Sequence, residues 1–315
     1  MADLKTESRF DGMRADARSA GSGRVAVAWP HDEEAVGSIL AAARQGLAVP
    51  VLVGDRSRIE DAVARTGESI GDAQVVAAHS PEEAARRAVA LVRGGDADVV
   101  MKGSLETAAL LKAVLDADEG LRTGRVLSHV AAFAVRDYPR ILLVTDAAMN
   151  IAPTVEQKQE IILNAVEVAH ALEVPEPCVA MLCAKEKVEP RMLATVEAGE
   201  LQERWKNGEI PGCIVSGPLA LDNAVSSRAA ELKGIDDPVA GRADILVAPD
   251  IEAGNILYKA LAFLAGAENA GIILGATAPI VLTSRADSLQ SRVDSIALAT
   301  LHARYRARIS EDSSR

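Results

Sequence analysis

The chain has 315 residues, which is long enough to bury a large core and to form two lobes. Hydrophobic residues make up 49% of it and charged residues 25%, ordinary proportions for a globular protein, but only 3% of the residues are aromatic. The scarcity of aromatic rings and the formal net charge of −11 argue against a nucleic-acid-binding protein, because such proteins depend on phosphate contacts and base stacking.

The sequence also argues against membrane insertion and secretion. No apolar run is long enough to span a bilayer, and residues 1–24 lack the apolar core of a signal peptide. The chain has three cysteines, and this odd, sparse count fits a reducing compartment. They form no C-x-x-C pair and so lack the spacing of metal ligands. We therefore expect a cytoplasmic protein with no metal, membrane or nucleic-acid partner.

Strands and helices alternate through the first third of the chain. Apolar, β-branched runs predict strands at 24–29, 49–54, 74–77 and 97–101. Helices are expected at 32–44, 56–65 and 81–93, and another follows residue 104 with apolar residues at helical spacing. The start at residue 81 is the clearest, since Ser80 is a good cap and Pro81 suits the first helical position.

The rhythm changes near the middle of the chain. Apolar runs at 126–130 and 140–145 lie too close together for a helix between them, so we expect adjacent antiparallel strands. The alternation then resumes. Helices are predicted at 154–172, 189–207, 219–232 and 252–265, and strands at 178–184, 212–216, 243–248, 271–275 and 278–283. A last helix begins after a cap at Asp287 or Ser288.

This pattern predicts an α/β fold in which helices cover a parallel or mixed sheet. About eleven strands are many for one open sheet, so two lobes with a cleft are expected. We predict an N-terminal arm at 1–23, a discontinuous first domain at 24–145 plus 276–315, and a second domain at 146–275.

Most predicted strands end in small, polar or cationic residues. These residues are Lys102, Gly103 and Ser104; Ser128 and His129; Thr145 and Asp146; Ser216, Gly217 and Pro218; and Ser284 and Arg285. The carboxyl ends of parallel strands meet at one edge, where backbone N–H groups and cations favour phosphate. An ordinary polar loop at each end is the alternative. Near two helix starts, Asp222 and the pair Asn255 and Lys259 add polar groups, and Gly254 indicates a close backbone approach.

Several enzyme classes lose support because their motifs are missing. The chain has no Walker loop, no G-x-G-x-x-G after the first strand and no G-x-S-x-G elbow. Nucleotide hydrolysis by a P-loop, a Rossmann dehydrogenase and an α/β-hydrolase are therefore disfavoured.

Six sequence blocks, in order, resemble one family. They lie at 101–103, 127–130, 145–151, 217–224, 254–260 and 284–288. The chain resembles the phosphate acetyltransferase and phosphate butyryltransferase family, and the butyryltransferase branch more closely. The resemblance implies reversible transfer of an acyl group, acetyl to butyryl, between coenzyme A and inorganic phosphate through a ternary complex. It also implies a two-lobed α/β/α fold like that of isocitrate and isopropylmalate dehydrogenases, with the site between the lobes, a homodimer, and coenzyme A as a substrate with no permanently bound cofactor.

The resemblance also implies roles for individual residues. Ser284 and Arg285 match the catalytic pair, in which the arginine binds phosphate or acyl phosphate and the serine stabilises an oxyanion. Lys112 takes the place of an arginine in the acetyltransferase branch. The expected phosphate- and substrate-binding residues are Lys102, Gly103, Lys112, Ser128, His129, Thr145, Asp146, Asn150, Ser216, Gly217, Pro218, Asp222, Asn255 and Lys259.

One position departs from the family pattern. The acetyltransferase branch has an aspartate seven residues after the catalytic serine, proposed to deprotonate the coenzyme A thiol, and this chain has Ser291 there. Asp287 and Asp294 are the nearest acids and are taken as catalytic candidates. Two alternatives stay open. One is a coenzyme A- or acyl-phosphate-binding protein with altered catalysis, and the other is a metal- and NAD-dependent dehydrogenase of the same fold, for which no carboxylate cluster is evident.

Overall fold

The computed structural model describes residues 8–283 and 286–313. The chain forms two compact units, which are unit 1, Met1–Arg125 with Ala270–Arg315, and unit 2, Val126–Asn269. The boundaries predicted at 145 and 275 are therefore displaced. The physical reason is strand pairing: the two strands on either side of residue 138 pair with each other and extend the sheet of unit 2. Within the described ranges, no helix is both long and apolar enough to cross a membrane.

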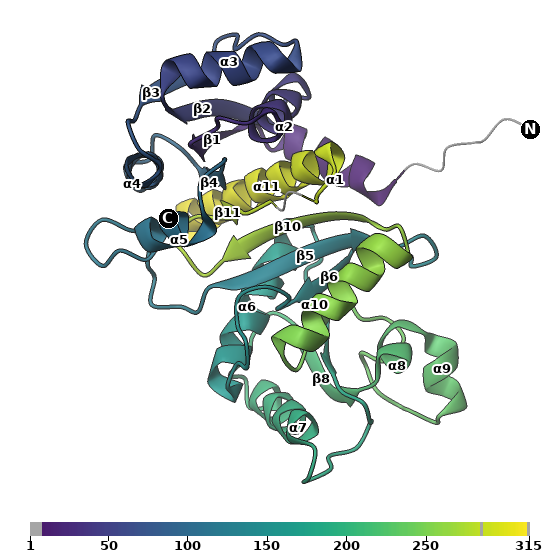
Figure 1. Ribbon diagram of the computed structural model, residues 1–315. Helices are drawn as coiled ribbons and strands as arrows, with labels where there is room; N and C mark the ends of the chain where they lie inside the picture. Colours follow the sequence, from purple (N-terminus) through teal and green to yellow (C-terminus); the bar gives the residue numbers. More distant parts are fainter. Residues whose placement is uncertain (1–7, 284–285, 314–315) are drawn as a thin grey trace, which may run out of the picture. The chain divides into compact units, whose positions relative to one another are not determined.

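Unit 1 contains a mixed sheet in the order β3-β2-β1-β4-β11-β10 (Figure 1). Its strands are β1 (Gly23–Ala28), β2 (Ala48–Gly54), β3 (Gln74–Ala77), β4 (Val99–Lys102), β10 (Glu268–Leu274) and β11 (Ile280–Val281). They run parallel except β10, which is antiparallel to β11. The short strand β11 follows β10 in the chain yet pairs with β4, so the carboxyl ends of β4 and β11 lie together.

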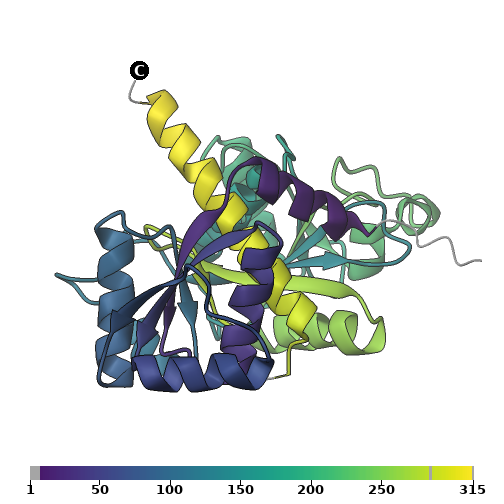
Figure 2. The ribbon, with the colours of Figure 1, turned by 90° about the horizontal axis from the view of Figure 1, so that it is seen from above.

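Helices cover both faces of this sheet. They are α1 (Arg9–Ser19), α2 (Glu33–Arg44), α3 (Arg56–Thr66), α4 (Pro81–Arg93), α5 (Thr107–Val114) and α11 (Leu289–Ser313). α2 and α11 pack against each other on one face, and α4 lies on the other (Figure 2). The predicted caps form: Ser80 caps α4 with Pro81 at its start, and Ser288 accepts from the Ser291 amide at the start of α11.

The expected N-terminal arm is in part a helix. Ser8 and Asp11 form a capping box at the start of α1, and Phe10, Met13 and Ala17 are buried. These apolar side chains recur at helical spacing, and α1 uses them to pack on α11. The first described residues of the chain therefore contribute to the core of unit 1.

Unit 2 has the strand order β5-β6-β9-β7-β8. Its strands are β5 (Ser128–Ala134), β6 (Leu142–Thr145), β7 (Cys178–Leu182), β8 (Ile214–Leu219) and β9 (Ile245–Val247). β5 and β6 are antiparallel neighbours, which confirms the prediction from their short connection, and the remaining pairs are parallel. Phe133, Val144 and Leu246 lie in the buried core cluster of this unit.

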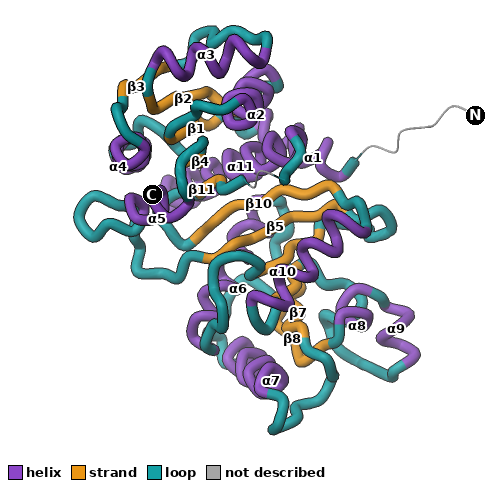
Figure 3. Tube along the Cα trace, viewed as in Figure 1, coloured by secondary structure: helices purple, strands orange, loops and turns teal. Residues whose placement is uncertain are grey.

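The helices of unit 2 are α6 (Val155–Ala171), α7 (Leu193–Lys206), α8 (Leu221–Val225), α9 (Ser227–Leu232) and α10 (Ile251–Lys259), with a π-helix at Ala260–Leu264. The single helix predicted at 219–232 is two helices, seen separately in Figure 3. Ser226 separates them because its backbone is extended and its hydroxyl accepts from the Ala229 amide, 3.3 Å away. The preceding strand also runs three residues further than predicted, to Leu219.

Candidate functional site

In unit 1, the loop after β4 is tied to the loop after β1. The Gly103 amide donates to the Ala28 carbonyl at 2.9 Å, and the Ser104 amide donates to the Trp29 carbonyl at the same distance. The Ser104 hydroxyl donates to the Trp29 carbonyl at 2.8 Å. A Cβ added to Gly103 would lie 2.5 Å from both carbonyl oxygens. Only glycine permits this approach, which brings the carboxyl ends of the neighbouring strands β1 and β4 together.

A hollow of about 310 Å³ opens at this edge of unit 1. It is lined by Asp32, Glu34, Ala35, Lys102, Gly103, Ser104, Leu105, Thr283 and Arg292. Lys102 Nζ donates to the carbonyls of Gly103 and Leu105, at 3.1 and 3.2 Å. Arg292, in the second turn of α11, is only 5% exposed. The hollow thus brings two cations and two carboxylates to the end of β4.

Three of these charged residues were not among the sequence candidates: Asp32, Glu34 and Arg292. Asp32 is the N-cap of α2, and its Oδ1 accepts from the Ala35 amide at 2.7 Å. A signal for Asp32 was available, since it lies in the short loop between a predicted strand and the start of a predicted helix. Arg292 had no such signal, because its place in the hollow depends on how α11 packs against the sheet.

The two predicted catalytic residues Ser284 and Arg285 lie outside the described residues. They follow Thr283, which lines the unit 1 hollow. Asp287 is half-buried in the turn before α11. The side chain of Ser291, which takes the place of the family's aspartate, is a hydroxyl, and the residue is buried in the first turn of α11.

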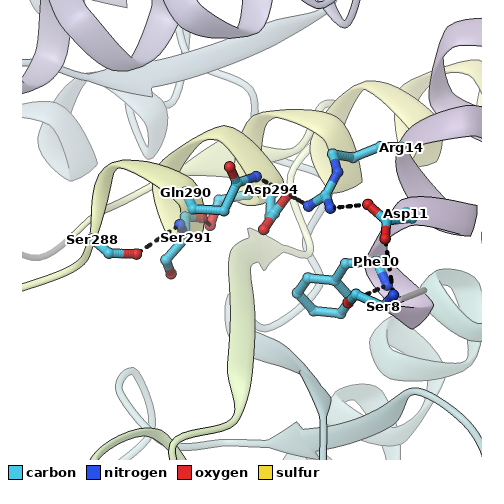
Figure 4. Close-up of polar contacts among 9 residues, drawn as sticks. Ser8, Phe10, Asp11, Arg14, Ser288, Gln290, Ser291 and Asp294 are labelled. Carbon is cyan, nitrogen blue, oxygen red and sulfur yellow. Dashed lines mark hydrogen bonds and ion pairs between the residues drawn. The ribbon is translucent and has the colours of Figure 1, made fainter. Parts of the chain in front are cut away.

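Asp294 is engaged in an ion pair (Figure 4). Its Oδ1 accepts from Arg14 Nη1 at 2.5 Å and from Gln290 Nε2 at 3.0 Å, and only 1% of its side chain is exposed. Arg14 also contacts Asp11 at 2.6 Å. Burial acts to lower the pKa of Arg14, but the hydrogen bonds that its guanidinium donates to Asp294 and Asp11 outweigh it and raise that pKa. This network joins α1 to α11.

In unit 2, the polar residues around 128 and 145 share one edge. Ser128 and His129 were predicted to end a strand, but they begin β5. Because β5 is antiparallel to β6, the start of β5 lies beside the end of β6. The Thr145 hydroxyl donates to the His129 carbonyl at 2.8 Å. Ser128 is buried and accepts from Asn164 Nδ2 at 2.8 Å. The His129 ring lies edge-on to that of Tyr258, with 5.8 Å between centroids.

The loop after β6 is organised by the Asp146 carboxylate, which is 4% exposed. Its Oδ1 accepts from the amides of Ala148 and Met149, at 2.9 and 3.0 Å. Its Oδ2 accepts from the backbone and side-chain nitrogens of Asn150, at 3.1 and 2.6 Å. Asn150 Nδ2 also reaches the Leu127 carbonyl at 2.8 Å, linking the loop to the start of β5.

The helix α10 packs closely on this loop. A Cβ on Gly254 would lie 2.2 Å from the Asp146 carbonyl oxygen, so the close backbone approach predicted for this glycine is confirmed. Asn255 Nδ2 donates to the Ala147 carbonyl at 3.1 Å. Lys259, one turn further on, is exposed.

Unit 2 has a hollow of its own, of about 1020 Å³, which is lined in part by the predicted residues Ser216, Gly217 and Pro218. It is lined by residues 185–188, 196, 199, 200, 202, 203, 216–219 and 233–237. Ser216 donates to the Asp237 carboxylate and accepts from Gln202 Nε2 at 3.1 Å. A Cβ on Gly217 would lie 2.6 Å from the Met181 Cβ, so this strand passes close to its neighbour.

The predicted residues Asp222 and Lys112 also line neither hollow. Asp222 is exposed on α8 and pairs with Lys233 at 3.2 Å. Lys112 is exposed in the last turn of α5. Across the residues that the structure describes, no group of three or more His, Cys, Asp or Glu side chains could hold a metal ion.

Comparison with known proteins identifies a family and close relatives. The sequence profile of the phosphate acetyl/butaryl transferase family matches residues 77–300. A probable phosphate butyryltransferase of Bacillus subtilis is 50% identical over 276 residues, which cover 87% of this chain and 91% of that protein. A phosphate acetyltransferase of Rhizobium meliloti is 44% identical over 299 residues, covering 95% of each chain.

Solved structures show the same architecture. A branched-chain phosphotransacylase from Enterococcus faecalis V583 superimposes with a TM-score of 0.79 at 33% identity, covering 89% of this chain and 98% of the other. A 4-hydroxythreonine-4-phosphate dehydrogenase from Burkholderia phymatum gives a TM-score of 0.55 at 16% identity, covering 89% of this chain and 98% of the other, and so shares the fold alone. The likeness to a dehydrogenase fold expected from the sequence is thereby confirmed.

Proposed function

Because this chain belongs to the phosphate acetyl/butaryl transferase family and is therefore a phosphate acyltransferase, we propose that it moves a short acyl group, acetyl to butyryl, between coenzyme A and inorganic phosphate in a ternary complex. The family match carries the proposal: it spans residues 77–300, which contain every candidate site residue from Lys102 to Asp294. The relatives include both butyryl- and acetyltransferases, so the range of acyl groups, from acetyl to butyryl, is part of the proposal.

In unit 1, we propose that Lys102 and Arg285 bind the phosphate of phosphate or acyl phosphate, and that Ser284 donates a hydrogen bond to the oxyanion. The unit 1 hollow supports this role for Lys102, because it adds a second, buried cation, Arg292. Gly103 allows the loop after β4 to approach the carbonyls of Ala28 and Trp29. The ion pair with Arg14 favours a structural role for Asp294.

In unit 2, we propose that Asp146, Asn150 and Asn255 position the loop after β6, while Ser128, His129 and Thr145 line its edge. The hollow at Ser216, Gly217 and Pro218 has the volume of a pocket for a ligand of coenzyme A's class, and we assign part of that substrate to it. The exposed cations Lys112 and Lys259 attract the anionic substrates, and Asp222 holds Lys233 at the rim.

The function is tested by the phosphate dependence of thiol release. Purified protein is given acetyl-, propionyl- and butyryl-coenzyme A with and without phosphate, and free thiol is measured. We expect release only with phosphate, together with formation of acyl phosphate, and a loss of turnover by orders of magnitude in Arg285→Ala. Equal release without phosphate indicates a hydrolase. Tight coenzyme A binding with no turnover of any acyl chain indicates the non-catalytic alternative.

We further propose that the enzyme is a cytoplasmic homodimer. Ile256, Phe263 and Leu264 support association, since they are 68%, 65% and 88% exposed along α10 and the π-helix that follows. Light scattering is expected to give twice the 33.0 kDa chain mass for the wild type and a shift toward the single chain mass in Phe263→Glu. A wild-type protein of one chain mass would contradict this.

A further inference from the structure

The thiol proton of coenzyme A needs an acceptor that the family pattern does not supply in this chain. Ser291 occupies the position of the expected aspartate and its hydroxyl is a poor base. Asp294, three residues on, is buried in the ion pair with Arg14 and shared with Gln290. A carboxylate from another part of unit 1 could take this role.

The unit 1 hollow contains such a carboxylate. Asp32 lines it together with Lys102 and Arg292, and Thr283, the residue before the predicted catalytic Ser284, lines it too. Asp32 is half-buried, and its Oδ1 is held by the Ala35 amide at 2.7 Å. This bond fixes the carboxylate at the start of α2, and a carboxylate has further acceptor capacity beyond one hydrogen bond. Glu34 lines the same hollow but is exposed.

We propose that Asp32 is the general base that accepts the proton of the coenzyme A thiol, an inference that rests on the proposed acyltransferase function. In the direction of acyl-coenzyme A synthesis, the S–H bond breaks and the proton passes to the Asp32 carboxylate. The sulfur then forms a bond to the acyl carbon of acyl phosphate, and the bond from that carbon to the phosphate oxygen breaks. Phosphate leaves with the bonding pair, and Asp32 returns the proton to it or to water. In reverse, protonated Asp32 donates to the leaving sulfur.

The other charged groups at the hollow are compatible with Asp32 as the base and with the cations as phosphate ligands. Lys102 and Arg292 are cations that can hold the phosphate, so the base does not have to contact it. Glu34 is the second carboxylate. His31 precedes Asp32, and burial, followed by the charge of Arg58, lowers the pKa of this imidazole, which favours its neutral form near pH 7. Glu33 does not line the hollow and pairs with Arg65 at 3.1 Å.

The test is the pH profile of acyl-phosphate thiolysis in Asp32→Asn. Asparagine is as good an N-cap as aspartate, so the start of α2 is preserved, and Asp32→Ser is a second variant that keeps a cap. With its base, the wild type is expected to vary little between pH 6.5 and 8.5. The variants depend on thiolate already present and should be about 100-fold slower at pH 6.5, recovering about tenfold per pH unit toward the thiol pKa of about 8.5. Glu33→Gln is the matched control and should follow the wild type.

The outcomes separate the possibilities. An equal loss at all pH values, or a change confined to the KM for phosphate, overturns the proposal and leaves Asp32 a charge-balancing residue. A pH-dependent loss in Glu34→Gln and not in the Asp32 variants overturns it in favour of Glu34. Unchanged kinetics in both Asp32 variants also overturns it. If the wild type itself shows no phosphate-dependent thiol release, the proposed function fails instead.

Discussion

Replacing Asp146 by asparagine tests whether the loop after β6 is held by this carboxylate. The substitution keeps the size of the side chain but turns one acceptor oxygen into an NH₂ donor. Each oxygen of Asp146 now accepts two hydrogen bonds, from the amides of Ala148 and Met149 or from the two nitrogens of Asn150. Whichever way the new amide turns, two donors face another donor.

The expected loss follows from these contacts. A hydrogen bond to a charged group contributes about 1.5 to 3 kcal/mol, so losing two destabilises the fold by about 3 to 6 kcal/mol. Burial of Asp146, which is 4% exposed, limits replacement by water. The amide of Asn150 also holds the Leu127 carbonyl at the start of β5, so the substrate edge of unit 2 should lose order and the acyltransferase rate should fall as well.

Denaturant unfolding followed by circular dichroism measures the loss as a lower midpoint at an unchanged slope. Asp222→Asn is the control, since Asp222 is an exposed aspartate paired with Lys233 and its midpoint should stay at that of the wild type. A wild-type midpoint for Asp146→Asn combined with lost activity would refute the reasoning, because Asp146 would then act on the substrate and not on the loop.

Two further predictions concern buried groups. Arg14→Met should leave the Asp294 carboxylate buried without its guanidinium partner, which should cost about 3 to 5 kcal/mol of stability in thermal or denaturant unfolding. Arg14→Lys should recover part of this loss. An unchanged stability of Arg14→Met would show that the pair does not hold α1 on α11. Burial raises the pKa of Tyr138 to about 12, and its hydroxyl donates to the Ala243 carbonyl. Because the folded state keeps this proton longer than the unfolded chain does, its contribution to stability is complete below about pH 10 and is lost as the pH rises toward 12. Ultraviolet titration should find one tyrosine still neutral at pH 11, and Tyr138→Phe should remove that signal; three tyrosines that ionise together near pH 10 would contradict it.

The local features of the fold could be predicted because they depend on neighbours in the chain. Ser80 and Pro81 start a helix through contacts within one turn, and the apolar runs that became β1, β2 and β3 appear at the predicted places. The antiparallel pair β5 and β6 followed from a connection too short for a helix. The family also followed from the sequence, since its motif blocks are short and ordered, and the profile match confirms it.

Other features depended on packing between distant segments. β11 pairs with β4, although about 180 residues separate them, and the pairing requires a return of the chain that no local pattern encodes. The partner of Asp294 is Arg14, 280 residues away, which changed the interpretation of an acid chosen for its closeness to Ser291. Arg292, Lys102 and Asp32 come from three elements, and only the tertiary structure of unit 1 places them around one hollow. Backbone propensities act over a few residues, whereas side chains from distant elements meet only after the sheet and its covering helices have packed.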